Sequence, residues 1–261
     1  MPVSPPSDLI ATLRAAGCVF AEEEARLLGA AAGSRSELDA LVARRVTGVP
    51  LEQVVGFVEF AGRRLAIEPG VFVPRRRTEL LARLAAEAAP PGGTLVELCC
   101  GAGAVAAVAA DDPTLSVHAA DIDPAAVACA RRNLPTGQVY RGDLDAALPA
   151  ALRGRVDVLV ANAPYVPSDE IGLLPAEARE YEPLVALDGG PDGLSVQRRI
   201  AAAAPRWLVP GGRLLIETGA HQATGTAAAM SAVGLAISVV TDPELAATVV
   251  VGVQPQPAGA A

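Results

Sequence analysis

The pattern of apolar and polar positions divides the chain into a short helical part and a longer part in which strands and helices alternate. Between residues 8 and 50, apolar residues at helical spacing, interrupted by glycines, predict three short helices. From residue 54 to residue 73 apolar and polar residues alternate, with turn residues at Gly62 and at Pro69 and Gly70. This alternation predicts a β-hairpin between the two parts.

Beyond residue 74 the pattern predicts a sheet with crossover helices. Strands are expected at 94–99, 116–120, 138–141, 156–161, 212–217, 235–240 and 247–253, and helices at 78–88, 103–110, 124–133, 192–204 and 221–233. Alternating strands and helices predict a mostly parallel sheet, with a ligand at the carboxyl ends of its strands. The last two strands are too close in sequence for a crossover helix, so they should form an antiparallel pair at one edge.

These elements suggest three units, which are a helical N-terminal domain over 1–53, a hairpin linker over 54–73 and an α/β domain over 74–261. The sequence does not decide whether the helical domain is a structural accessory or a surface that recognises a protein partner. A Pro- and Gly-rich stretch at 90–93 is the clearest break in the pattern.

Composition and charge narrow the class of protein. Of the 261 residues, 51% are hydrophobic, which is typical of a folded globular chain, and the net charge of −8 disfavours nucleic acid as the main partner. Four cysteines without CxxC spacing, with only two histidines, make a metal site unexpected. The start of the chain does not resemble a signal peptide and no apolar run is long enough to span a membrane, so a cytoplasmic protein is expected.

The stretch 156–165 carries the chemistry. A β-branched apolar run, typical of a strand buried on both faces, ends in Asn162, Ala163, Pro164 and Tyr165. The side-chain oxygen of Asn162 and the carbonyl of Ala163 are two acceptors that can converge on one planar NH2 group. Pro164 removes a backbone donor and keeps Ala163 extended, and Tyr165 offers a flat ring. The pattern predicts a socket for an amide or an exocyclic amine, whereas its simplest interpretation is a turn that ends a strand.

Three earlier strand ends predict a site for an adenosine-containing cofactor. Gly101 and Gly103 follow the first strand, Asp121 follows the second and Asp143 the third. The glycines let the backbone approach a ligand, whereas the two carboxylates can accept from ribose hydroxyls and an adenine amine. A glycine turn alone is weak evidence, but these three ends in succession are more specific.

With these residues in place, the chain resembles the class I S-adenosylmethionine-dependent methyltransferases. Within them it is most similar to the protein-glutamine methyltransferases that modify the Gly-Gly-Gln loop of peptide chain release factors. The resemblance covers most of the chain: Pro50-Leu51-Glu52-Gln53, Gly56, Phe60, Pro74-Arg75, Thr78-Glu79, Glu97 to Gly103, Asp121, Asp143, Asn162 to Tyr165, Glu182-Pro183, Ala186-Leu187, Gly189-Gly190, Asp192-Gly193-Leu194, Pro210-Gly211-Gly212 and Glu217-Thr218-Gly219.

The resemblance implies a Rossmann-like class I methyltransferase domain and roles for particular residues. The residues implied in binding S-adenosylmethionine are Glu97, Cys99, Gly101, Gly103, Asp121, Asp143, Leu144 (beside the adenine) and Asn162. The implied catalytic residues are Asn162, Ala163, Pro164 and Tyr165. The implied substrate-binding residues are Phe72, Arg75, Thr78, Glu79, Asn162 and Tyr165.

Three departures from the family pattern suggest a diverged member. The family motif is Asn-Pro-Pro-Tyr, and Ala163 stands where its first proline would be. Cys99 replaces the first glycine of the cofactor loop, which narrows the space near the methionine end, and Arg77 stands at a position that is usually acidic.

The resemblance therefore implies transfer of a methyl group from S-adenosylmethionine to a glutamine side-chain amide of a protein. The acceptor protein would be a release factor or another protein, and the enzyme would be a monomer. Enzymes that methylate adenine N6 or cytosine N4 in nucleic acid use a similar socket, so a nucleic-acid amine methyltransferase is an alternative. Ala163 and Cys99 leave open an inactive partner protein that only binds the cofactor. A nicotinamide-dependent oxidoreductase fits least, because a third loop glycine is absent.

Overall fold

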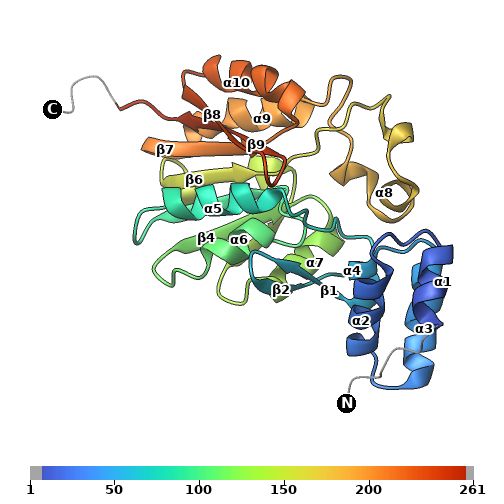
Figure 1. Cartoon of the computed structure of the whole chain (residues 1–261). Helices are drawn as coiled ribbons and strands as arrows, with labels where there is room; N and C mark the ends of the chain where they lie inside the picture. Colours follow the sequence, from blue (N-terminus) through green and yellow to red (C-terminus); the bar gives the residue numbers. More distant parts are fainter. Residues whose placement is uncertain (1–7, 257–261) are drawn as a thin grey trace.

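The computed structural model describes residues 8–256 (Figure 1). The chain begins with four helices, α1 (Leu9–Ala15), α2 (Ala21–Ala31), α3 (Arg35–Val46) and α4 (Leu51–Val55). They pack around a small core of their own, to which Leu13, Leu28 and Leu38 contribute fully buried side chains. The helical character predicted for this part is present, with α4 as an additional helix.

The predicted hairpin is shorter than the alternating pattern suggested. It consists of β1 (Phe57–Phe60) and β2 (Arg63–Ala66), joined by a turn in which Gly62 has a φ of +75°. The first two residues of the predicted segment belong to α4, which ends at Gly56 with a φ of +82°. The apolar run at 54–55 thus closes a helix, because glycine in the left-handed conformation ends the helix just before the hairpin.

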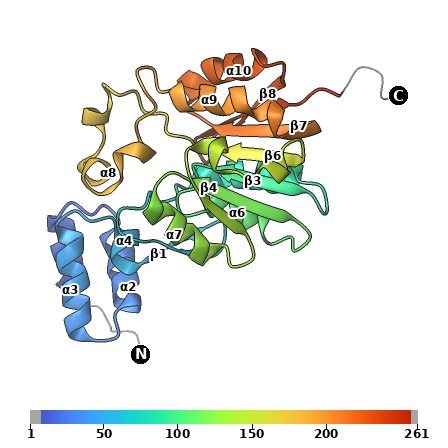
Figure 2. The ribbon, with the colours of Figure 1, turned by 180° about the vertical axis from the view of Figure 1, so that it is seen from behind.

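The remaining strands form the mixed seven-stranded sheet that was predicted, with helices on both faces (Figures 1 and 2). Its strands are β3 (Thr94–Leu98), β4 (Ser116–Asp121), β5 (Gln138–Arg141), β6 (Val156–Ala161), β7 (Leu208–Glu217), β8 (Ala236–Asp242) and β9 (Ala247–Val253). The spatial order is β5-β4-β3-β6-β7-β9-β8, in which β9 runs antiparallel to its two neighbours. The order reverses between β3 and β6, which is where open α/β sheets bind ligands.

Strand β6 shows why its sequence is a continuous apolar run. Val158 and Val160 pack in the core on one face of the sheet, whereas Leu159 and Ala161 pack in the core on the other. All four side chains are fully buried. A central strand covered by helices on both sides has no solvated face, so polar residues do not alternate with apolar ones.

The helices of the α/β part are α5 (Thr78–Ala88), α6 (Ala104–Ala109), α7 (Pro124–Asn133), α9 (Ser195–Ala203) and α10 (Ala223–Ser231). Residues of α5, α6, α7 and the hairpin share one core with the sheet, and residues of α9 and α10 share the other. The predicted bounds of α5 and α7 agree with the structure, whereas α9 and α10 are shorter than predicted. Within residues 8–256, no helix is both long enough and apolar enough to cross a membrane.

The segment between β6 and α9 contains α8 (Ala176–Tyr181), which the sequence pattern did not predict. Figure 1 shows α8 beside the N-terminal helices, apart from the sheet. Gln53 donates to the Tyr181 carbonyl at 3.2 Å, and the Tyr181 hydroxyl donates to the Thr47 carbonyl at 2.9 Å. These contacts connect α8 to the N-terminal helices, while the boundaries of the three domains remain a prediction.

Candidate active site

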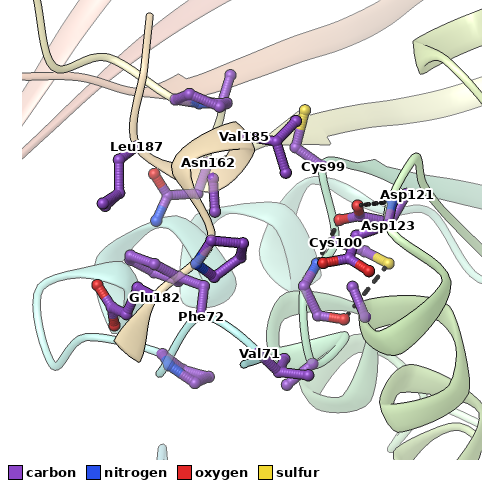
Figure 3. Close-up of a pocket in the computed structure, with 18 of the residues that line it drawn as sticks. Val71, Phe72, Cys99, Cys100, Asp121, Asp123, Asn162, Glu182, Val185 and Leu187 are labelled. Carbon is purple, nitrogen blue, oxygen red and sulfur yellow. Dashed lines mark hydrogen bonds between the residues drawn. The ribbon is translucent and has the colours of Figure 1, made fainter. Parts of the chain in front are cut away.

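A cavity of about 700 Å³ lies at the carboxyl ends of β3, β4, β5 and β6. Figure 3 shows Asp121 and Cys100 on one side of it and Asn162, Phe72 and Glu182 on the other. We call the side formed by the ends of β3, β4 and β5 the cofactor half, and the side formed by residues 162–165 and the start of α5 the acceptor half. Parallel strands bring these ends together because their carboxyl ends share one edge of the sheet.

In the cofactor half, Asp121 holds the loop that follows β3. Its Oδ2 accepts from the Gly101 N–H at 2.8 Å and its Oδ1 accepts from the Asp123 N–H at 2.9 Å. Burial raises the pKa of Asp121, and these backbone donors partly offset that rise. Each oxygen keeps a further lone pair with which it can accept from a ligand hydroxyl.

Glu97 anchors the other end of this loop. Its Oε2 accepts from the Ala106 N–H at 2.8 Å, in the first turn of α6. Burial raises the pKa of Glu97 to about 8, because the charged form loses its hydration. Between these anchors, Cys99 adopts a φ of +53°, in the left-handed region that favours glycine. The backbone therefore keeps a glycine-like conformation although the residue is Cys99.

Asp143 and Leu144 complete the cofactor half. Asp143 Oδ2 accepts from Arg199 Nη2 at 2.6 Å, in a pair that is half-exposed. Leu144 is buried at 8% exposure, and Ile122 at the end of β4 is 48% exposed and also lines the cavity. These two side chains offer apolar surface for a flat ring beside the carboxylates.

The acceptor half is built around Asn162. Its Nδ2 donates to Thr78 Oγ1 at 3.1 Å, which leaves its Oδ1 available to accept. Ala163 follows and is buried at 1% exposure. The Tyr165 carbonyl accepts from Gln222 Nε2 at 2.8 Å, which fixes the end of the turn. The Arg77 guanidinium lies 5.8 Å from the centroid of the Tyr165 ring.

An ion pair between half-exposed Arg75 and buried Glu182 positions the remaining wall of this half. Arg75 Nη2 donates to both oxygens of Glu182, at 2.7 Å and 2.8 Å, and Glu182 Oε1 also accepts from the Val73 N–H at 3.3 Å. Burial raises the pKa of Glu182, and the Arg75 charge lowers it. Arg75 also lies over the Phe72 ring, 5.0 Å from its centroid. The segment after α8 is thereby attached to the edge of the cavity.

Of the residues to which the sequence analysis assigned a catalytic, cofactor-binding or substrate-binding role, all but two line this cavity. The lining includes Phe72, Arg75, Thr78, Glu97, Cys99, Gly101, Asp121, Asp143, Leu144, Asn162, Ala163, Pro164 and Tyr165. Gly103 lies outside it, and a Cβ there would sit 3.1 Å from a Leu134 methyl, so its role is packing against α7 at a φ of +75°. Glu79 also lies outside it, and its Oε1 accepts from the Ala61 N–H of the hairpin turn at 3.1 Å.

Some charged residues near the site had no role assigned from sequence, among them Glu182, Arg199 and Glu217. Glu182 and Arg199 line the cavity, and Glu217 at the end of β7 is buried behind Thr78 and Arg77. Glu182 and Glu217 belong to motifs of the family resemblance, and this was the signal in the sequence that could have pointed to them. Their partners are distant in sequence, so the contacts emerge only in the folded chain.

The sheet order, the antiparallel β9 and the cavity at the β3–β6 switch point define a class I methyltransferase fold. The sequence profile of the methyltransferase small domain matches residues 63–173. A solved methyltransferase from Pyrococcus furiosus aligns with a TM-score of 0.55 and 15% identity, over 82% of this chain and 97% of its own. A ribosomal protein L11 methylase from Lactobacillus delbrueckii subsp. bulgaricus aligns with a TM-score of 0.52 and 16% identity, over 73% and 84%.

Curated relatives identify the family within this fold. A release factor glutamine methyltransferase of Geobacter sulfurreducens is 38% identical over 70% of this chain and 65% of its own length. The proteins of the same name from Cereibacter sphaeroides and Moorella thermoacetica are 39% and 37% identical, over 79% and 83% of this chain and 75% and 77% of their own lengths. This chain belongs to the release factor glutamine methyltransferase family. The match to the Geobacter protein spans slightly less than two thirds of that relative.

Proposed function

We propose that this chain transfers a methyl group from S-adenosylmethionine to the side-chain amide nitrogen of a glutamine in a protein, with a peptide chain release factor as the acceptor. The observation that carries the proposal is the hydrogen bond from Asn162 Nδ2 to Thr78 Oγ1 at 3.1 Å. It commits the amide NH2 of Asn162 to the protein, so the side-chain oxygen is left as an acceptor for a substrate NH2. The names of the relatives support the same acceptor.

The cofactor half suits S-adenosylmethionine. A Cβ at Gly101 would meet no atom within 4 Å, so the backbone there borders open space. Asp121 and Asp143 would accept from ribose hydroxyls and from the adenine amine, with Leu144 and Ile122 against the ring. The carboxylates also suit a cationic ligand and would repel a pyrophosphate, which disfavours a dinucleotide. When bound, the cofactor supplies an electrophilic methyl group.

The acceptor half addresses the weak nucleophilicity of a carboxamide, whose nitrogen lone pair is delocalised into its carbonyl. Asn162 Oδ1 and the Ala163 carbonyl would accept from the two N–H groups of the substrate amide and orient its nitrogen. As positive charge develops on this nitrogen, both acceptors bind it more strongly, which stabilises the transition state relative to the ground state. The fixed orientation of the amide contributes a further part of the rate enhancement.

The side chains around these acceptors shape the entrance for a glutamine. Phe72 and Tyr165 provide flat apolar surfaces for the aliphatic part of the side chain, and Arg75 is held by Glu182 beside them. With a glutamine bound, these apolar surfaces would reduce the access of water to the amide, so its hydrogen bonds to Asn162 and Ala163 would be stronger than in solvent.

The proposal is tested by incubating the purified chain with isotopically labelled S-adenosylmethionine and a bacterial release factor. We expect peptide mass spectrometry to find one labelled methyl group on the glutamine of the Gly-Gly-Gln loop. A release factor in which that glutamine is replaced by alanine is the matched control and should remain unlabelled. Label on nucleic acid, or on no acceptor while the cofactor still binds, would contradict the proposal.

A further inference from the structure

Glu217 is a buried carboxylate behind the acceptor half that the proposed chemistry does not use. It is the last residue of β7, is 1% exposed and does not line the cavity. Among the residues that the structure describes, neither of its oxygens has a hydrogen-bond partner, although Arg77 Nε lies 3.4 Å from Oε1 in an ion pair. A buried carboxylate without donors is costly, so this one calls for an explanation.

The hydroxyl of Thr78 is placed so that it could link Glu217 to Asn162. Thr78 and Arg77 lie next to the carboxylate and lower its pKa, whereas burial raises it. A hydroxyl has one hydrogen to donate and lone pairs to accept with. Thr78 Oγ1 already accepts from Asn162 Nδ2, so its own hydrogen is free to turn toward Glu217.

We propose that Glu217 is a positioning residue that sets the direction of the Asn162 side-chain amide through Thr78. This inference rests on the proposed function. The ion pair with Arg77 favours the ionised form of Glu217, and an ionised carboxylate can only accept. It therefore holds the Thr78 hydrogen, and the Thr78 oxygen must then accept from Asn162 Nδ2. Asn162 Oδ1 is left facing the substrate, as the binding of an NH2 group requires.

The reverse direction would disable the socket. If a donor stood at position 217, the Thr78 hydrogen would turn toward Asn162, whose amide would rotate to accept it. Asn162 would then present its NH2 to the NH2 of a substrate glutamine, so two donors would face each other. A carboxylate at 217 prevents this arrangement, whereas an apolar residue there would leave the direction of the amide unset.

The side chain of Arg77 makes Glu217→Gln a directed test rather than a simple removal of charge. Arg77 Nε lies 3.4 Å from Glu217 Oε1 and can donate, so the oxygen of an introduced glutamine amide should face Arg77. The NH2 of the introduced amide is then left for the Thr78 side. The variant keeps the size and shape of the side chain and reverses the hydrogen-bond direction.

The experiment compares the wild type, Glu217→Gln and the exposed control Glu244→Gln, which lies in the turn between β8 and β9. Affinities for two peptides that differ only in glutamine or glutamate at the acceptor position are measured with S-adenosylhomocysteine present. We expect Glu217→Gln to lower the preference for the glutamine peptide about tenfold, because Asn162 then offers donors that suit a carboxylate. Turnover should fall by a similar factor, while S-adenosylmethionine affinity and the control variant stay within about twofold of the wild type.

Two substitutions at Thr78 provide an independent check if Glu217→Gln does not fold. Thr78→Val keeps the shape without the hydroxyl and should reproduce the loss of preference, whereas Thr78→Ser keeps the hydroxyl and should retain it. An equal loss of affinity for both peptides, or an unchanged preference in Glu217→Gln and Thr78→Val, would overturn the inference. A wild type without a preference for glutamine would instead contradict the proposed function, so the two failures are distinguishable.

Discussion

The two halves of the cavity hold their polar groups in different ways. In the cofactor half, Glu97 and Asp121 accept from backbone N–H groups of the loop and of neighbouring helix starts. In the acceptor half, Asn162 is held by Thr78, side chain to side chain, and Arg77 is paired with Glu217. The first half therefore depends on the path of the backbone, and the second on the identity of particular side chains.

This difference predicts different consequences of substitution. Backbone donors remain in place when a neighbouring side chain changes, so the cofactor half should lose affinity gradually. A side-chain network loses its direction when one member is replaced, because the remaining groups can re-pair. Substitutions in the acceptor half should accordingly reduce turnover more than binding.

The largest effect is expected for Asn162→Ala. This change removes one of the two acceptors proposed for the substrate amide and leaves the cofactor half intact, so kcat should fall about 100-fold or more. Calorimetric titration should show S-adenosylmethionine affinity close to that of the wild type. The exposed amide of Gln138 on β5 provides a control, and Gln138→Ala should leave kcat unchanged. If Asn162→Ala and the wild type methylated the acceptor protein at equal rates, the role assigned to Asn162 would be wrong.

An intermediate effect is expected for Asp121→Asn in the cofactor half. In the wild type, each oxygen of Asp121 accepts from a backbone N–H group. In the variant, the amide NH2 faces one of these N–H groups, and the side chain has fewer acceptors for the ribose hydroxyls. The Kd for S-adenosylmethionine should rise about tenfold, with kcat at saturating cofactor nearly unchanged. Calorimetry and saturation kinetics separate the two parameters. A fall in kcat at unchanged Kd would contradict the assignment of cofactor binding to one half and of turnover to the other.

Strong local signals allowed most of the sheet and its helices to be predicted from sequence. The bounds of α7 agree because Asp123 caps the helix, accepting from the Ala125 N–H at 2.8 Å, and Pro124 occupies its first position. The bounds of β6 agree because its β-branched run is buried on both faces. The residues expected at the ends of these elements line the cavity for the same reason, since the topology brings strand ends together.

The contacts that could not be predicted join segments that are distant in sequence. The pair between Arg75 and Glu182 and the position of α8 depend on the fold of the whole chain. Residues 166–187 have no clear helix or strand period, and they are held by contacts with the N-terminal helices and with Arg75. Glu79 was expected at the site from the family resemblance, as Thr78 was, but successive residues of a helix point about 100° apart. Its side chain consequently faces the hairpin.

A smaller effect in the cofactor half concerns stability and pH. Burial gives Glu97 a folded-state pKa of about 8, against an ordinary value of 4.5. Between these values the folded state binds more protons than the unfolded chain, so Glu97 makes the free energy of unfolding fall as pH rises through this window. Thermal melting of wild type and Glu97→Gln across the window isolates the effect of this group. The variant should lack this part of the slope, and an identical slope in both proteins would show that Glu97 titrates normally.

The smallest effect is expected for Ala163→Pro, which restores the proline of the family motif. The substitution keeps the Ala163 carbonyl and reduces the conformational entropy of the unfolded chain, so Tm should rise by about 1–3 °C. Differential scanning calorimetry measures this shift. Turnover should stay within about twofold of the wild type, because the acceptor half depends on the Asn162 and Thr78 side chains more than on the stiffness of its turn. A large gain in kcat would reverse that conclusion and make backbone rigidity at position 163 the limiting feature of the acceptor half.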